Sequence, residues 1–243
     1  MFFGEGQGDW RISESDIRHG PSHIFNLTVW PGEFVAIVGE SGSGKSTLMN
    51  ILNGIYKPNH GKIYYKGKKV SIRSPRHAVD MGIGMVHQHF KLVDVLTAAE
   101  NIVLGLPGKG KLDMKRITED IQKLADKYGF ELDLSQKIYE MSVSQKQTVE
   151  IIKMLYRGAR ILILDEPTAV LTPQESDRLF DILRNMRKDG CSIMIITHKL
   201  QEVLALSDRV AILRKGKYID TVETAQANAQ SLSEMMVGGR VDL

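Results

Sequence analysis

The sequence contains a single cysteine, Cys191, so no disulfide can form within the chain. One thiol also leaves nothing from which to build a cysteine-rich zinc cluster. Cys191 opens the apolar run 191–196, and we interpret it as a small core residue. A chain without disulfides suits a reducing cytosol.

Long hydrophobic runs are missing as well. No apolar stretch approaches the roughly 20 residues that a membrane-spanning helix needs. The N-terminus has no signal-peptide pattern, because no apolar stretch follows a basic start. We therefore expect any link to a membrane to depend on partner proteins.

A large excess of positive or negative charge is missing too. The net charge is +3, which is too small to indicate nucleic-acid binding without a concentrated basic face. Two local basic clusters, 66–69 and 214–217, surround glycines between apolar runs. That setting favours solvated hairpin turns. We expect no nucleic-acid partner.

Short apolar runs alternate with helical patterns, which predicts an α/β fold around a mostly parallel sheet. The clearest predicted strands are Phe34–Val38, Ile83–Val86, Ile161–Leu164, Ser192–Ile196 and Val210–Leu213. Lys62–Lys66 predicts an antiparallel strand on a smaller sheet. From Leu96 to Arg157 a helical period dominates and no strand is expected. We interpret residues 1–243 as one domain, with a helical subdomain at about 92–158 inserted into the α/β core.

A phosphate-binding loop is the most specific motif. The stretch 39–47 fits G-x-x-x-x-G-K-[ST] in full, after an apolar strand and before a predicted helix at Ser46–Asn53. In such loops successive N–H groups face phosphate oxygens, and the helix N-terminus adds positive potential. We expect Lys45 to reach the β- and γ-phosphates of ATP and Ser46 to ligate Mg²⁺. The expected nucleotide contacts are Gly39, Glu40, Ser41, Gly42, Ser43, Gly44, Lys45, Ser46 and Thr47. The alternative is an ordinary Gly/Ser turn.

Two carboxylates, Asp165 and Glu166, end the apolar strand 161–164. Ligands of open α/β sheets bind at this edge. We expect Asp165 to hold Mg²⁺ and Glu166 to act as general base on the attacking water. The alternative is a pair of solvated loop acids.

Two further strands end in polar side chains. His198 follows the strand 192–196, and we expect it to contact the γ-phosphate, although a lone histidine is more often structural. Gln88 ends the strand 83–86 and is a candidate for Mg²⁺ or the attacking water. His87 and His89 flank it, but a metal site there lacks an evident third ligand.

These motifs, in this order, resemble the ATP-binding cassette (ABC) family, over nearly the whole chain from Asn26. Gly39–Thr47 is similar to its Walker A, Gln88 to its Q-loop, Ile161–Glu166 to its Walker B with the catalytic glutamate, and His198 to its switch histidine. Met141–Gln147 corresponds to the signature. The segments 82–90, 99–105 and 159–175 and the ending 235–243 resemble the first cassette of bacterial simple-sugar and nucleoside importers, which usually fuse two cassettes.

The resemblance implies a P-loop ATPase that energises import of a small solute. In that family two ATPs lie between two cassettes arranged head to tail, so that each signature faces the other cassette's ATP. Ser142, Ser144 and Gln145 are then expected to contact nucleotide. The implied partners are transmembrane permease subunits, a second cassette and, indirectly, an extracytoplasmic substrate-binding protein. The implied location is the cytoplasmic face of the inner membrane, as a peripheral subunit.

Four positions depart from the family pattern. Ser144 stands in place of the second signature glycine, Thr148 in place of an arginine, and Thr172 in place of the D-loop aspartate. Thr172 also begins a good capping box, Thr-Pro-Gln-Glu. No aromatic residue stands where the family stacks on adenine, roughly at Ser15 and Asp16; Trp10 is nearby at another spacing.

Two other functions are weighed against the importer. Ser144, Thr148 and the missing aromatic residue favour a regulatory cassette that binds ATP and turns it over poorly, whereas Glu166 and His198 favour hydrolysis. Thr172 carries little weight here, because its capping box gives it a structural explanation.

A soluble ABC protein of DNA repair or translation is disfavoured, because the interval from Gln88 to Ser142 has no room for a long coiled coil and the charge is mild. The 4–8 glycine-rich stretch follows no predicted strand, and we interpret it as a flexible start.

Overall fold

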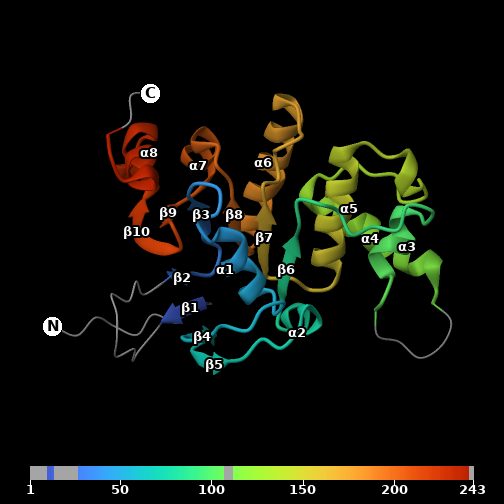
Figure 1. The fold of residues 1–243 in the computed structure, drawn as a ribbon. Helices are drawn as coiled ribbons and strands as arrows, with labels where there is room; N and C mark the ends of the chain where they lie inside the picture. Colours follow the sequence, from blue (N-terminus) through green and yellow to red (C-terminus); the bar gives the residue numbers. More distant parts are fainter. Residues whose placement is uncertain (1–9, 14–26, 107–111, 241–243) are drawn as a thin grey trace.

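The computed structural model describes residues 10–13, 27–106 and 112–240. Its central element is a six-stranded sheet in the order β10-β9-β3-β8-β7-β6 (Figure 1). The strands of this sheet are β3 (Phe34–Val38), β6 (Ile83–Val86), β7 (Ile161–Asp165), β8 (Ser192–Ile196), β9 (Arg209–Arg214) and β10 (Lys217–Glu223). The described helices are α1 (Lys45–Leu52), α2 (Pro75–Asp80), α3 (Ala98–Val103), α4 (Met114–Tyr128), α5 (Val143–Tyr156), α6 (Pro173–Lys188), α7 (Leu200–Leu206) and α8 (Ala229–Val237), with 3₁₀ turns at Ile138–Glu140 and Thr224–Gln226.

The five predicted strands form the parallel part of this sheet. The strands β9, β3, β8, β7 and β6 are mutually parallel, and only the edge strand β10 is antiparallel to its neighbour. Their sequences are apolar at nearly every position because both faces of the sheet are covered. The predicted α/β class with a mostly parallel sheet is therefore confirmed.

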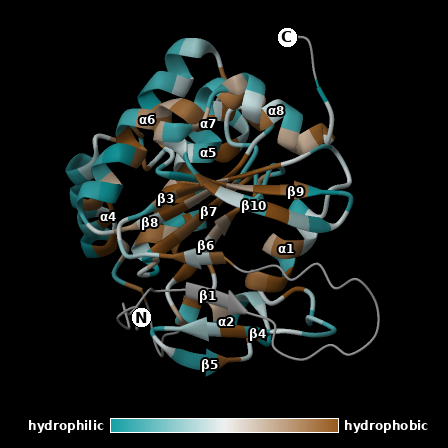
Figure 2. Ribbon diagram, turned by 90° about the vertical axis from the view of Figure 1, so that its left-hand side faces the viewer, coloured by the Kyte–Doolittle hydropathy of each residue, from teal (hydrophilic) through white to brown (hydrophobic). Residues whose placement is uncertain are grey.

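Two hydrophobic clusters pack against the sheet, one on each face. In β3, Phe34 and Ala36 pack into the cluster that contains α3 to α8, whereas Val35 and Ile37 pack with α1 and α2. Figure 2 shows α5 to α8 on one side of the sheet and α1 and α2 on the other. The alternation of side chains along a strand thus anchors helices on both faces at once.

A second, antiparallel sheet packs beside α1 and α2, in the order β2-β1-β4-β5. Its strands are β1 (Trp10–Ser13), β2 (Leu27–Val29), β4 (Lys62–Tyr65) and β5 (Lys68–Val70). The prediction of an antiparallel strand at Lys62–Lys66 is confirmed. Of the four departures, the positions Ser15 and Asp16 lie outside the described residues, as does the stretch 4–8.

Both basic clusters occupy hairpin turns, as predicted. Lys66 and Gly67 join β4 to β5, and Lys215 and Gly216 join β9 to β10. All four residues have positive φ, between 49° and 75°. Two-residue turns of this kind match the twist of the flanking strands, which explains their glycines.

In the residues that the structure describes, the segment between β6 and β7 consists of helices, one 3₁₀ turn and the loops that join them. It contains α3, α4 and α5, and no strand occurs in its described part. None of the helices in the described ranges is both long and apolar enough to cross a membrane. The predicted change of periodicity after Leu96 therefore corresponds to a real change of architecture.

Close packing between β6 and α5 leads to a stability prediction. A methyl group at Gly84 would lie 2.7 Å from Met154 Cβ and 3.0 Å from Ala159 Cβ. We expect Gly84→Ala to lower the free energy of unfolding by about 1–3 kcal/mol, because overpacking shifts the helix. Thermal denaturation measures this change. Gly239→Ala, whose methyl group meets open space, is the control, and equal melting temperatures for the two variants would contradict the packing argument.

Candidate nucleotide-binding site

Four neighbouring parallel strands end at the same edge of the sheet, and each is followed by a predicted site residue. The order β3-β8-β7-β6 brings the loops after Val38, Ile196, Asp165 and Val86 side by side. These loops carry Lys45, His198, Glu166 and Gln88 in that order. The sheet therefore gathers at one edge residues that are up to 153 positions apart (198 − 45).

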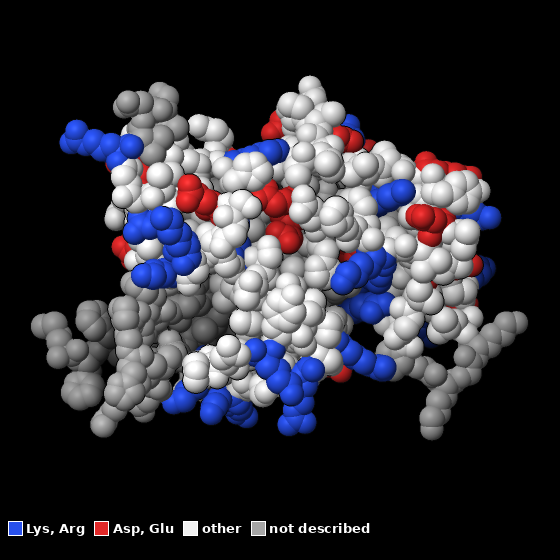
Figure 3. Space-filling model, in the orientation of Figure 1, with Lys and Arg blue, Asp and Glu red and all other residues white. Residues whose placement is uncertain are grey.

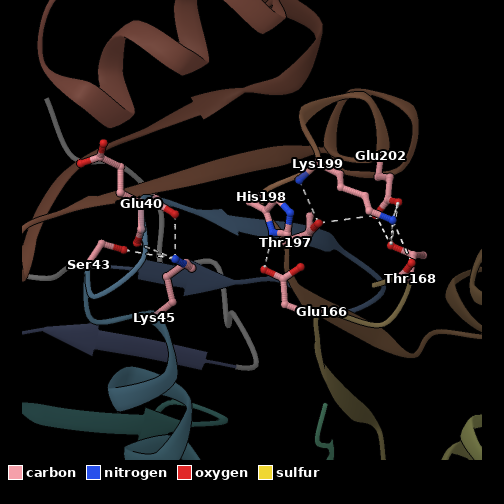
Figure 4. A network of polar contacts seen from close by, with 10 residues as sticks. Glu40, Ser43, Lys45, Glu166, Thr168, Thr197, His198, Lys199 and Glu202 are labelled. Atoms are coloured by element: carbon pink, nitrogen blue, oxygen red, sulfur yellow. Dashed lines mark hydrogen bonds and ion pairs between the residues drawn. The ribbon is translucent and has the colours of Figure 1, made fainter. Parts of the chain in front are cut away.

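The phosphate loop folds back on its own lysine. The Lys45 ammonium donates to the carbonyls of Gly39 at 2.7 Å and Glu40 at 2.9 Å, and to the Ser43 hydroxyl at 3.3 Å (Figure 4). Gly39 is required sterically, since a Cβ there would lie 2.2 Å from the Leu213 carbonyl oxygen. The lysine is therefore held by weak neutral acceptors in a loop of fixed shape.

No side chain in the described part of the chain accepts a hydrogen bond from the first N–H groups of α1. Its N-cap is Gly44, with φ of 99°, and neither a capping side chain nor an acidic residue occupies its first turn. By contrast, an oxygen-bearing side chain caps α2, α3, α4, α5, α6 and α8. Free N–H groups and the helix dipole favour an anion at this end. The predicted helix after the loop is confirmed, one residue earlier than expected.

Charged groups of opposite sign face each other across the loop. Burial lowers the pKa of the Lys45 ammonium, and the charges of Glu166 and Asp165 oppose that shift. Burial raises the pKa of the Asp165 carboxyl, as does the charge of Glu166, while Lys45 opposes the shift. The two acids therefore lie close enough to Lys45 to interact, as a phosphate and metal site requires.

Glu166 is paired with His198. The Glu166 Oε1 atom lies 2.9 Å from His198 Nδ1, while the second carboxylate oxygen, Oε2, is buried without a hydrogen-bond partner in the described structure. The Glu166 side chain is 15% exposed and that of His198 is 65% exposed. A buried carboxylate oxygen with no donor is free to accept a hydrogen bond from a water molecule.

Gln88 lies with the two acids. A small hollow of about 100 Å³ is lined by Gln88, Asp165 and Glu166, together with His87 and His89. Gln88 and His89 are exposed, so their side chains are accessible. No cluster of three or more His, Cys, Asp or Glu side chains suited to a metal ion occurs among the described residues. The hollow thus joins the Gln88 loop to the Asp165 loop.

The signature residues lie elsewhere, at the N-terminus of α5. Ser142 caps this helix and forms a capping box with Gln145. The Ser144 hydroxyl lies 3.2 Å from that of Ser142. No acceptor for the N–H groups of Val143 and Ser144 is found in the described structure. Figure 1 places α5 apart from α1, beyond β6 and β7, so these residues do not join the phosphate loop of their own chain.

The departures have local structural roles. The Thr148 hydroxyl donates to the Ser144 carbonyl at 3.0 Å, inside the first turns of α5. Thr172 caps α6 and forms the predicted capping box with Glu175, with Pro173 at the first helical position. Cys191 is buried, as expected, which raises the pKa of its thiol to about 12.

Several residues of the site edge escaped the sequence analysis. The Lys199 ammonium donates to the Thr168 carbonyl at 2.8 Å, and Glu202 pairs with Lys199 at 3.3 Å. The only signal was position, since Thr168 follows Glu166 by two residues and Lys199 follows His198 directly. The sequence analysis also did not predict that the β9–β10 turn contacts the phosphate loop. The Gly216 N–H in this turn donates to the Ser43 carbonyl at 3.2 Å.

Comparison with known proteins gives the family. Residues 23–169 match the profile described as ABC transporter, which is more than half of the chain. The chain belongs to the ABC transporter family. The order of the motifs along the sequence agrees with this membership.

Curated members of the ABC family resemble the chain over most of its length. The nucleoside import ATP-binding protein NupA of Lactococcus lactis is 51% identical over 218 residues, 89% of this chain and 43% of that protein. The guanosine import ATP-binding protein NupO of Bacillus subtilis shares 51% over the same shares of both chains. The ribose import ATP-binding protein RbsA 2 of Escherichia coli O157:H7 shares 41%, over 88% of this chain and 42% of that protein. The chain spans less than half the length of these relatives.

Solved ABC structures share the fold. CbiO1 from Clostridium perfringens, part of the transporter complex cbiONQ, has a TM-score of 0.77 at 26% identity, over 96% of this chain and 95% of its own. The ADP conformation of MJ1267, an ATP-binding cassette, has a TM-score of 0.80 at 23% identity, over 96% of this chain and 100% of its own. At that identity the second likeness concerns the fold alone.

Proposed function

We propose that this chain binds and hydrolyses ATP as the cassette of an importer for a small solute. One observation carries the proposal: four adjacent strand ends bring Lys45, His198, Glu166 and Gln88 to a single edge of the sheet. ABC family membership supports ATP as the nucleotide. The residues proposed to contact it on this chain are those of the loop 39–47.

The chemistry follows from the charges. Lys45 leaves its carbonyl acceptors for the β- and γ-phosphates, and the α1 N-terminus receives the anion. The Glu166 carboxylate accepts a proton from the attacking water as the water oxygen bonds to the γ-phosphorus. The bond between the γ-phosphorus and the β–γ bridging oxygen breaks in the same displacement, and ADP and phosphate are released. His198 holds Glu166 through Nδ1 and presents its other ring nitrogen towards the phosphate.

The donor set fits Mg²⁺. Ser46, Gln88 and Asp165 all offer oxygen ligands, which suit a small hard cation. Ser46 and Gln88 are exposed, and Asp165 is half-buried at the end of β7, where it lines the same hollow as Gln88. When bound, Mg²⁺ neutralises charge on the β- and γ-phosphate oxygens.

The solute is a simple sugar or a nucleoside. NupA, NupO and RbsA 2 are named for nucleoside, guanosine and ribose import. The two nucleoside proteins are the more similar, at 51% against 41% identity, which favours a nucleoside. We propose that the chain acts at the cytoplasmic face of the inner membrane with permease subunits, which receive the solute from an extracytoplasmic binding protein.

A second cassette completes the site. In this proposal the α5 N-terminus, with Ser142, Ser144 and Gln145, faces the ATP bound by the partner cassette. The N–H groups of Val143 and Ser144 are the donors that remain for a phosphate, since the capping box uses those of Ser142 and Gln145.

A groove beside the Gln88 loop is the proposed permease contact. It has a volume of about 530 Å³ and lies between α2 and α5, with Lys91, Lys153 and Arg157 in its lining. The Arg157 Nε atom is buried without a partner among the described residues. Figure 3 shows basic side chains gathered on the face between α2 and α5. Because His87 lines both this groove and the Gln88 hollow, a segment docked here contacts the wall of the catalytic site.

Charge reversal at the groove tests this contact. We expect Lys91→Glu to weaken association with the coexpressed permease subunits about tenfold, since an acidic partner segment then meets a like charge. Lys91 is exposed, so the fold tolerates the change. Lys115→Glu on α4 makes the same exposed charge change outside the groove. Equal affinity of the two variants, measured by co-purification across a salt series, would place the contact elsewhere.

The proposed function is tested by Mg·ATP binding and hydrolysis by the purified chain. Binding that requires Lys45 and turnover that requires Glu166 support it. Binding without turnover favours a regulatory cassette, or one that needs its second cassette. Absence of ATP binding overturns the proposal.

A further inference from the structure

A buried polar cluster joins the two loops that carry Glu166 and His198. Its members are Thr168, on the β7 side, and Thr197, Lys199 and Glu202, on the β8–α7 side (Figure 4). The Thr168 hydroxyl donates to the Glu202 carboxylate, at 2.6 and 2.7 Å from its two oxygens. The Lys199 ammonium donates to the Thr168 carbonyl at 2.8 Å. Lys199 and Glu202, on the β8–α7 side, therefore both bind Thr168 on the β7 side.

The cluster also contains the two chain neighbours of His198. The Lys199 N–H donates to the Thr197 hydroxyl at 3.1 Å, and that hydroxyl lies 3.5 Å from a Glu202 oxygen. Thr197 and Lys199 are the chain neighbours of His198 on either side. The histidine side chain itself is exposed, so its place is set by its neighbours.

Most of the cluster is buried, and only the Lys199 side chain, which is 37% exposed, reaches it from the surface. Thr168 and Thr197 are fully buried, and the Glu202 side chain is 11% exposed. A buried carboxylate is stable only when donors satisfy it, and here Thr168 and Lys199 provide them. Shifting either loop would leave buried polar groups without partners.

Glu166 needs such support because its backbone is strained. Its φ is +48°, in the left-handed region, which costs a residue with a side chain about 1–2 kcal/mol. The Glu166 N–H donates to the Ile196 carbonyl at 2.8 Å, directly before Thr197. Strain of this kind persists where the surroundings hold it. The Glu166 carboxylate points at His198 (Figure 4).

We propose that Thr168, Lys199 and Glu202 are positioning residues that hold Glu166 and His198 at a fixed separation for ATP hydrolysis. The inference rests on the proposed function for its consequence in turnover. Its structural part is a direct hydrogen-bonded connection between the Glu166 loop and the His198 loop, and this connection does not depend on nucleotide.

This connection is tested in the nucleotide-free chain by hydrogen–deuterium exchange. We expect Lys199→Met to speed exchange of the hydrogen-bonded amides of Glu166, Ala169 and Leu171 roughly tenfold, and Thr168→Val to do the same for the Lys199 amide. A tenfold faster exchange corresponds to a decrease of about 1.4 kcal/mol in the free energy of local opening. Lys123→Met is the matched control, because Lys123 also forms a lysine–acid pair three residues apart, with Asp120, but on an exposed helix face. If each variant speeds exchange only in the loop that carries the substitution, the two loops are not connected and the proposal is refuted.

Turnover supplies the second readout. We expect Lys199→Met to lower kcat at least tenfold with KM little changed, and Thr168→Ser, which keeps the hydroxyl, to retain more turnover than Thr168→Val. A wild-type kcat in Lys199→Met overturns the positioning role. An unmodified chain without ATP binding overturns the proposed function instead, and the exchange experiment still tests the connection.

Discussion

Replacing Glu166 by glutamine is expected to abolish ATP turnover while ATP binding is retained. The amide keeps the size of the side chain and its contact with His198, but it cannot take a proton from water at neutral pH. Loss of a general base lowers kcat by about 10²–10⁴-fold. Binding is expected to be equal or tighter, because one negative charge beside the phosphates is removed. Steady-state phosphate release and equilibrium ATP binding measure the two effects.

The same variant also reports on Asp165. The Glu166 charge helps to raise the pKa of the Asp165 carboxyl, after burial itself. Without that charge the pKa of Asp165 falls towards its ordinary value, so the ionised form persists to lower pH. Mg²⁺-dependent ATP binding by Glu166→Gln should therefore extend to lower pH than that of the unmodified chain. Turnover at the unmodified rate in Glu166→Gln would exclude Glu166 as the base.

Replacing Lys45 by alanine is expected to have the largest effect on ATP affinity. Hydrogen bonds from a charged donor contribute about 1.5–3 kcal/mol each. With contacts to two phosphates, we expect a loss of about 3 kcal/mol, or roughly a hundredfold in Kd. The ammonium is held by the Gly39 and Glu40 carbonyls before nucleotide arrives, so its loss also loosens the loop. Titration calorimetry with Mg·ATP measures the change.

A matched control separates charge from folding. Lys115→Ala removes an exposed lysine from α4, away from the sheet edge, and is expected to leave ATP affinity unchanged. Both variants should keep a cooperative thermal transition. If Lys45→Ala binds ATP as tightly as the control, the phosphate loop does not form the proposed site.

The fold was predictable where the apolar pattern was continuous. The strand sequences of β3, β6 and β8 are buried at every position, and their predicted limits are those observed. β10 was missed because it is an edge strand whose positions are exposed or half-buried, so it has no apolar run. β1, β2 and β5 are three or four residues long. Strands this short are stabilised by their partners and have little local signal.

The site was predictable where a motif has a fixed local geometry. The loop 39–47 and the capping box at Thr172 depend on contacts within a few residues, and both are observed. Gln88 and His198 were predicted because each follows an apolar strand and matches a family motif, and the structure brings them to the same edge as Asp165. The partners Thr168 and Glu202 are 34 positions apart, and no spacing rule connects such residues.

The sequence by itself determined the α/β class, the phosphate loop, the acids at the end of β7 and the resemblance to the ABC family. These depend on periodicity and short motifs, which chain neighbours carry. The tertiary structure alone decided the order of the strands and therefore which loops meet. It also decided the pairing of Glu166 with His198, and the burial of the Thr168–Glu202 contact. Hydrogen-bonding between parallel strands joins residues far apart in the chain, and one sequence pattern is compatible with several strand orders.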